Sequence, residues 1–139
     1  MYDATANVSP EVLAAFCDGM RFAGMLDPLP EALIDAGSAV AGCGPAFAAM
    51  MLEAMADAAV KLGVQRADSY KLAAQMVVGT GKLMLETGQH PGAMKDAVCS
   101  PGGTTIEAVA ALEAGGFRDA VITAQRACVQ KSKDMTKKN

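Results

Sequence analysis

Residues 45–60 read PAFAAMMLEAMADAAV, the longest apolar stretch of the chain. Alanine loses no side-chain entropy in a helix, so this alanine-rich run favours a helix over a strand. Pro45 suits the first helical turn because its missing N–H would have no partner there. The stretch therefore predicts a helix from Pro45 to about Leu62, ended by Gly63.

The same preference extends along the chain, which has 28 Ala against 3 Ile and no Trp. This composition predicts an all-α fold with no strand. Ser9 is the expected N-cap of the first helix, and a break is expected at residues 42–45. The Lys-rich end, residues 131–139, is expected to be a frayed tail. The first helix is expected to begin at Pro10, with an apolar stripe that reaches Met20, and the segment to end at Asp27-Pro28-Leu29-Pro30. The other expected helices run from Pro30 toward Val40, Asp68 to Thr87, Pro91 toward Val98, about Thr105 to Glu113, and Phe117 to about Lys131.

Length and charge narrow the class of protein further. A chain of 139 residues and 14.2 kDa fits a single domain, residues 1–139. The fraction of apolar residues, glycine included, is well above that of a typical soluble domain. We therefore expect some of these residues to lie in a subunit interface. The net charge of −3 argues against nucleic acid as a partner.

The sequence also bears on location and on metals. Glu53 and Asp57 interrupt the apolar stretch and no basic leader precedes it, so we expect neither a membrane span nor a signal peptide. The expected compartment is the cytoplasm. Four scattered cysteines with one histidine predict neither a disulfide framework nor a metal site.

The segment of most chemical interest is Ser100-Pro101-Gly102-Gly103-Thr104-Thr105-Ile106-Glu107. Two glycines before a helix start let successive N–H groups converge at the positive end of the helix dipole. Such a turn suits a small anion such as a carboxylate, and the hydroxyls of Ser100, Thr104 and Thr105 would add donors. Thr104 and Glu107 match a capping box, so an ordinary capped helix is the competing interpretation.

Other motifs favour structural roles. A nucleophilic Cys43 would need a base, and the single histidine offers thin support. Gly79-Thr80-Gly81-Lys82 lacks the remaining residues of a phosphate-binding loop. Glycine inside a helix is unfavourable, so Gly79 and Gly81 suggest that another helix approaches closely there. His90, just before Pro91, is expected to make a local cap. Asp57 is expected to share a charged helical stripe with Glu53 and Lys61.

Several motifs together resemble the C-terminal helical domain of pyrroline-5-carboxylate reductase from about Asn7 to Met135. They are Ala41-Gly42-Cys43-Gly44-Pro45-Ala46-Phe47, Ala56-Asp57-Ala58-Ala59-Val60-Lys61-Leu62-Gly63, Glu86-Thr87-Gly88-Gln89-His90-Pro91-Gly92, Lys95 through Thr105, and Gly115-Gly116-Phe117-Arg118. The segment Ser-Pro-Gly-Gly-Thr-Thr is the most specific of them. The resemblance implies a helical dimerisation domain whose long helices interlock with a partner subunit.

The resemblance also implies a reaction, the NAD(P)H-dependent reduction of 1-pyrroline-5-carboxylate to L-proline, the last step of proline biosynthesis. It assigns the substrate carboxylate to Ser100, Gly102, Gly103 and Thr104, and places the Thr105 hydroxyl near the ring nitrogen as the catalytic group. The family binds its nucleotide on an N-terminal Rossmann domain, which this chain lacks. We therefore expect the chain to bind no cofactor and to be inactive alone.

Two alternatives and one departure accompany that resemblance. One alternative is a structural module that oligomerises or docks on a separate Rossmann domain. The other is a divergent imine reductase domain for another cyclic substrate. The family's turn usually reads Gly-Ser-Gly-Pro, and Cys43 here replaces that serine, which weakens a hydrogen bond near the site.

Overall fold

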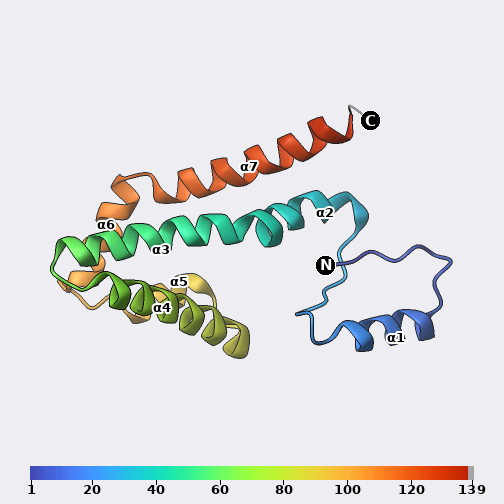
Figure 1. Ribbon diagram of the computed structural model, residues 1–139, viewed down its shortest axis with the longest axis horizontal. Coiled ribbons are helices and arrows are strands. Elements are labelled where there is room, and N and C mark those ends of the chain that lie inside the picture. The colour runs from blue at the N-terminus through green and yellow to red at the C-terminus, as the bar shows by residue number, and fades with distance from the viewer. Residues whose placement is uncertain (138–139) are drawn as a thin grey trace. The chain divides into compact units, whose positions relative to one another are not determined.

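The computed structural model describes residues 1–137, and these residues form helices joined by short turns (Figure 1). No β-strand occurs among them, and one isolated parallel β-bridge joins Tyr2 to Pro28. The all-α prediction is confirmed. The helices are α1 (Pro10–Met20), α2 (Glu31–Ser38), a π-helical turn (Ala39–Cys43), α3 (Gly44–Lys61), α4 (Arg66–Thr87), α5 (Pro91–Ala97), α6 (Thr104–Ala114) and α7 (Phe117–Thr136).

These residues form two compact units. One unit comprises residues 1–45 and 123–139, of which the structure describes those up to 137, and it holds α1, α2 and most of α7. In it the Ser132 hydroxyl donates a hydrogen bond of 2.7 Å to Asp35, which ties α7 to α2. The other unit comprises residues 46–122 and holds most of α3 with α4, α5 and α6.

The expected break at residues 42–45 is wrong. The helix continues from α2 into α3 through the π-helical turn Ala39–Cys43, and Gly44 donates its N–H to the Val40 carbonyl. Pro45 lacks a donor and its ring crowds the preceding turn, so a regular α-helix would be disrupted there. A π-helical turn shifts the hydrogen-bond pattern locally, so the proline is accommodated without ending the helix.

Gly63 ends α3, as predicted, and Gly88 ends α4. Gly63 has φ +99°, and Val64 donates its N–H to the Ala59 carbonyl in a Schellman arrangement. Gly88 has φ +64° and donates to the Met84 carbonyl. At the other end of a helix, the Ser9 hydroxyl accepts from the N–H of Val12 and confirms the first N-cap.

The frayed tail predicted for residues 131–139 is wrong as far as Thr136, because α7 continues to that residue. Local polar contacts support its last turns. Gln130 donates to Asp134 at 2.8 Å, and Thr136 donates to the Ser132 carbonyl at 3.2 Å. Residues 138 and 139 lie outside the described part of the chain.

The helices α3 and α4 fold back on one another in Figure 1, and each carries small buried residues. Ala56 on α3 is buried, as are Ser69 and Ala73 on α4. Asp57, expected to share a charged stripe with Glu53 and Lys61, forms an ion pair with Arg66 at the start of α4. An exposed pair of this kind adds little stability, so the small buried side chains are the main feature of this contact.

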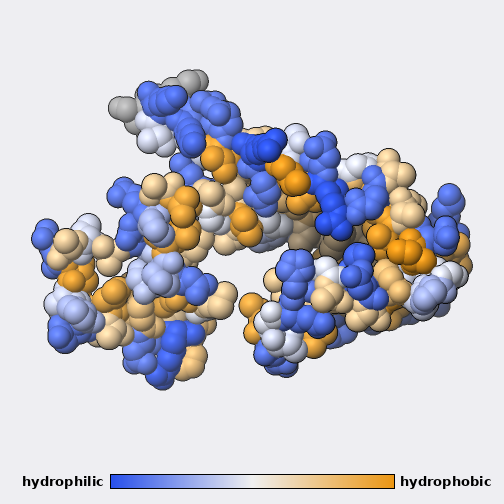
Figure 2. Space-filling view, turned by 180° about the vertical axis from the view of Figure 1, so that it is seen from behind, coloured by the Kyte–Doolittle hydropathy of each residue, from blue (hydrophilic) through white to orange (hydrophobic). Residues whose placement is uncertain are grey.

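Most apolar side chains of the described residues remain uncovered, as the orange patches of Figure 2 show for one face. The buried residues are Ala39, Ala56, Ala73 and Ser69. The helical run Glu31–Lys61 is long and apolar enough to cross a membrane by length and composition. The same exposed apolar surface is also what an obligate subunit interface requires, because such an interface resembles a core divided between two chains.

Candidate functional site

A tight turn connects α5 to α6 and directs the chain into the start of α6. Gly103 donates its N–H to the Ser100 carbonyl at 3.0 Å, and Gly102 has φ +66°. Proline at the second position and a left-handed glycine at the third are the pattern of a type II turn. Any other residue at position 102 would be strained, so the glycine is required by the backbone.

Gly103 lies in a confined place beside Ser100. A Cβ atom at this position would lie within 2.2 Å of the Ser100 hydroxyl and 3.1 Å of the Ser100 carbonyl oxygen. The serine side chain therefore folds over the glycine at the mouth of the turn. This contact holds the Ser100 hydroxyl beside the start of α6.

The capping box predicted for Thr104 and Glu107 is wrong. Gly103 occupies the N-cap position, with φ −79° and ψ 169°, and no side chain caps the helix. Thr104 is the first helical residue, so its hydroxyl is one position too late for that role. The first N–H groups of α6 lack intrahelical partners, as at any helix N-terminus, and they retain the capacity to bind an anion.

The structure thus brings together all the residues predicted for the carboxylate site, Ser100, Gly102, Gly103, Thr104 and Thr105, on one turn and one helix start. Ser100, Gly102 and Thr104 are exposed, whereas Gly103 and Thr105 are half-buried. The site is therefore an open surface of this unit. What each side chain does to a substrate stays a prediction.

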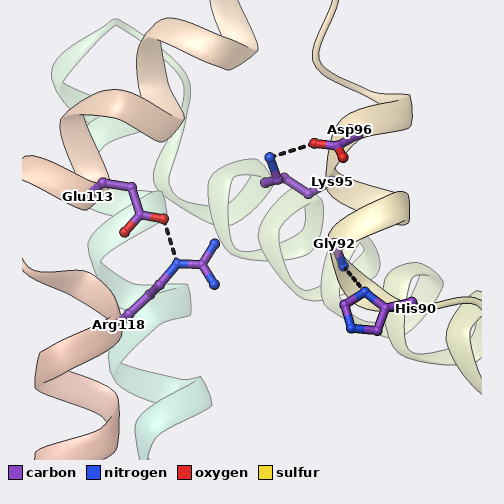
Figure 3. Close-up of polar contacts among 6 residues, drawn as sticks. All are labelled: His90, Gly92, Lys95, Asp96, Glu113 and Arg118. Atoms are coloured by element: carbon purple, nitrogen blue, oxygen red, sulfur yellow. Dashed lines mark hydrogen bonds and ion pairs between the residues drawn. The ribbon is translucent and has the colours of Figure 1, made fainter.

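Two basic side chains of the unit that holds this turn were not assigned a role from the sequence. Figure 3 shows Lys95 from α5 and Arg118 from α7. Lys95 contacts Asp96 at 2.6 Å, and Arg118 pairs with Glu113. Asp96 raises the pKa of Lys95 and Arg118 opposes that rise, so the two cations are close enough to interact. Both residues lie within the motifs that carry the family resemblance, and their position in those motifs could have pointed to them.

His90 has the structural role predicted for it. It is the N-cap of α5, and its Nδ1 accepts a hydrogen bond of 3.0 Å from the N–H of Gly92 (Figure 3). Because this nitrogen serves the helix cap, we assign no catalytic step to His90.

Gly79 and Gly81 do not mark a close helix contact within the described residues. A Cβ atom at either position would meet no atom within 4 Å. Both residues instead line an apolar groove of about 590 Å³ between α4 and α5, together with Met76, Leu83, Met84, Met94 and Val98. Because glycine has no side chain, these two positions leave the groove wider than larger residues would.

Cys43 has a second thiol as its neighbour. A hydrogen bond with Cys43 and partial burial raise the pKa of the Cys128 thiol. A neighbouring thiol is not a base that could activate Cys43 as a nucleophile. The contact therefore gives the nucleophile hypothesis for Cys43 no support.

This contact makes a testable prediction. Replacing Cys43 by alanine removes the main cause of the raised pKa, so more Cys128 is thiolate at pH 8. We expect iodoacetamide to modify Cys128 several-fold faster in Cys43→Ala than in the wild type, measured by peptide mass spectrometry. Cys99 provides the internal control, and an unchanged or slower rate at Cys128 would contradict the assignment.

The described residues are helical and leave a large apolar surface uncovered, as in a domain that associates with a second subunit. The start of α6 adds a place where an anion can bind. The family model of pyrroline-5-carboxylate reductase dimerisation matches residues 31–135. The chain belongs to this family.

Individual relatives agree with that assignment. Pyrroline-5-carboxylate reductase of Escherichia coli K12 is 52% identical over 132 residues, which cover 95% of this chain and 49% of the relative. The enzyme of Synechocystis is 47% identical over 135 residues, or 97% of this chain and 51% of the relative. The chain thus spans about half the length of the curated relatives it matches.

Solved structures match as well. The pyrroline-5-carboxylate reductase of Coxiella burnetii has a TM-score of 0.89 at 32% identity, covering 95% of this chain and 49% of that one. The Plasmodium falciparum enzyme, solved with NADP bound, has a TM-score of 0.85 at 31% identity, covering 94% and 53%.

Proposed function

We propose that this chain is the dimerisation and substrate-binding half of a pyrroline-5-carboxylate reductase, and that it holds the carboxylate of 1-pyrroline-5-carboxylate at the turn before α6. The observation that carries the proposal is the Ser100–Gly103 turn, which leaves the start of α6 uncapped in a chain of this family. The reaction is the reduction of the substrate C=N bond to L-proline in the cytoplasm.

Each residue of the turn has a distinct task in this proposal. The free N–H groups at the start of α6 and the Ser100 hydroxyl donate to the two carboxylate oxygens, and charge-assisted hydrogen bonds of this kind are the stronger ones. Gly102 and Gly103 permit the turn that places them. Thr104 adds a hydroxyl on the exposed side. Thr105, one position further and half-buried, places its hydroxyl near the ring nitrogen.

Lys95 and Arg118 add a long-range contribution to the same site. Their positive charges favour an anion near the turn, although Asp96 and Glu113 neutralise part of that field. We therefore assign the carboxylate to the turn itself and give the two cations a supporting electrostatic role.

The nucleotide is a separate matter, because NAD(P)H needs a phosphate-binding turn. Within residues 1–137 no strand leads through a glycine-rich turn into a helix, the arrangement that binds a dinucleotide. The described residues do not fit that cofactor, so we derive no hydride step from them. In this proposal the reductant, which donates the hydride, is bound by a nucleotide-binding half outside residues 1–137.

The proposal is tested by reconstitution. The purified chain is assayed for NAD(P)H oxidation with 1-pyrroline-5-carboxylate, alone and mixed with the part of the Escherichia coli relative outside its match. We expect turnover in the mixture and none with the chain alone. A mixture without activity, with both parts folded and associated, would favour the purely structural module.

A further inference from the structure

Two of the four cysteines are neighbours in space, although they lie far apart in the sequence. Cys43 ends the π-helical turn and Cys128 lies on α7, and a hydrogen bond joins their thiols. Both side chains are half-buried, and both belong to the same compact unit. The two sulfur atoms therefore meet within one unit, at a place that solvent partly reaches.

The helices that carry the two cysteines are packed together at this point. Ala39, in the same π-helical turn as Cys43, is buried, with 3% of its surface exposed. It lines a shallow depression of about 390 Å³ together with Gln125 and Val129, which flank Cys128 on α7. The contact between the thiols thus agrees with the packing of the residues around them.

A polar contact fixes the register of the same two helices. The Ser132 hydroxyl donates a hydrogen bond of 2.7 Å to Asp35 on α2, which continues into the turn that holds Cys43. Ser132 follows Cys128 by four residues and therefore lies on the same face of α7. The segments run antiparallel from this contact, so the register keeps the two thiols opposite each other.

The other two cysteines have different surroundings. Cys17 lies on α1 beside the Tyr2 hydroxyl. Cys99 precedes Ser100 in the unit of residues 46–122, and its charged form interacts with Lys95. Since both are also half-buried, they are internal references for the reactivity of the pair.

We propose that Cys43 and Cys128 form a redox-active dithiol, a modification site that hydrogen peroxide oxidises to a disulfide and that a dithiol reductant restores. In a reducing compartment such as the cytoplasm, a pair of this kind is held as thiols and is oxidised only transiently. The proposal is independent of the carboxylate site before α6.

The oxidation takes place in two steps. The Cys43 thiolate attacks one peroxide oxygen, the O–O bond breaks, and the second oxygen leaves as hydroxide, which takes up the proton that the thiol lost. The Cys128 sulfur then attacks the resulting sulfenic acid, an S–S bond forms, and the hydroxyl group leaves with the second thiol proton as water. The two thiols lose two electrons, and the peroxide accepts them. Cys43 reacts first because the raised pKa of Cys128 leaves less thiolate there.

The position of the pair gives the disulfide a consequence for stability. The chain passes into the second compact unit at residue 46 and returns at residue 123, so the bond closes a covalent loop that contains this whole unit. Closing a long loop removes conformational freedom mainly from the unfolded chain. We therefore expect the oxidised protein to resist thermal unfolding better than the reduced protein.

Peptide mapping of the oxidised full chain tests the proposal. The reduced dimer is treated with hydrogen peroxide at pH 8, the remaining thiols are alkylated in denaturant, and unreduced peptides are identified by mass spectrometry. We expect more than about half of the protein to carry a Cys43–Cys128 disulfide within one chain, with Cys17 and Cys99 recovered as alkylated thiols. Dithiothreitol should restore both thiols. No disulfide in a folded dimer, a bond between two subunits, or bonding of Cys17 or Cys99 in its place would overturn the proposal.

A thermal melt of matched variants measures the consequence. Oxidation should raise the Tm of the wild type by at least about 5 °C. Cys43→Ser should abolish this rise, whereas Cys17→Ser, the same change at a half-buried cysteine of the same unit, should retain it. An equal rise in Cys43→Ser, or an oxidised wild type that melts no higher than the reduced protein, would contradict the stabilising cross-link.

Discussion

At micromolar concentration the chain is expected to sediment as a dimer or larger assembly, with no compact monomer. The reason is the number of large apolar side chains that neither unit covers. Leu85 is 72% exposed and Met50 69%, although both lie on long helices. Without a second subunit these side chains would face water, so folding and association are expected to be linked. A compact monomer in sedimentation velocity would contradict this account.

One substitution makes the same prediction sharper. Leu83 lines the apolar groove between α4 and α5 and is 48% exposed. Covering the rest of it by a partner is worth about half of the roughly 1.5–3 kcal/mol for full burial, and an aspartate there would also have to lose its hydration. A symmetric dimer loses this contribution twice, so Leu83→Asp should raise the dimer Kd by a factor of about 100 or more. The measurement is sedimentation equilibrium over a concentration series.

The control for Leu83→Asp is its neighbour. Lys82 is exposed and forms a weak ion pair with Glu86 at 3.7 Å. Lys82→Glu changes the charge of the same helix by more, yet we expect at most about a tenfold change in Kd, because an exposed pair contributes little. If both variants dissociate the dimer equally, charge and not apolar burial is responsible.

The second large effect is expected at the turn before α6. Gly103→Val should reduce the affinity for L-proline by at least about tenfold, because the new side chain collides with Ser100 and opens the turn. Sedimentation should still show the dimer, because the substitution changes one turn and leaves the exposed apolar side chains of the long helices in place. Isothermal titration of the dimer with L-proline measures the effect.

Gly19→Val is the matched control, since a Cβ atom there meets no atom within 4 Å. It should bind L-proline like the wild type. A Gly103→Val dimer with unchanged affinity would show that the carboxylate lies elsewhere.

Much of the fold follows from local sequence. Ser9, Gly63 and Gly88 each fix a helix end through a hydrogen bond or a left-handed backbone, and both kinds of signal are short in range. The wrong break at residues 42–45 has the same local origin. Glycine and proline favour a stop, but a π-helical turn satisfies the backbone there, and nothing in the four residues selects between these outcomes.

The sequence predicted which residues form the candidate site, but it did not predict which of them caps the helix. The two glycines of the turn indicated the anion site, yet placing the N-cap at Gly103 and not at Thr104 depends on a one-residue shift. The contact of Ser132 with Asp35 joins residues far apart in the sequence, so no local pattern predicts it. Tyr2 and Pro28 likewise form a β-bridge between distant positions, and no strand pattern in the sequence predicted it.

The most direct test of the account is the response of single amides in the dimer to L-proline. In a 15N spectrum of the dimer, we expect the largest shifts at the N–H groups of Thr104, Thr105 and Ile106, with none of comparable size on α1 or α7. Saturation of these shifts would confirm that the chain holds the substrate carboxylate at the start of α6. Shifts confined to other residues, or none in a folded dimer at saturating L-proline, would contradict it.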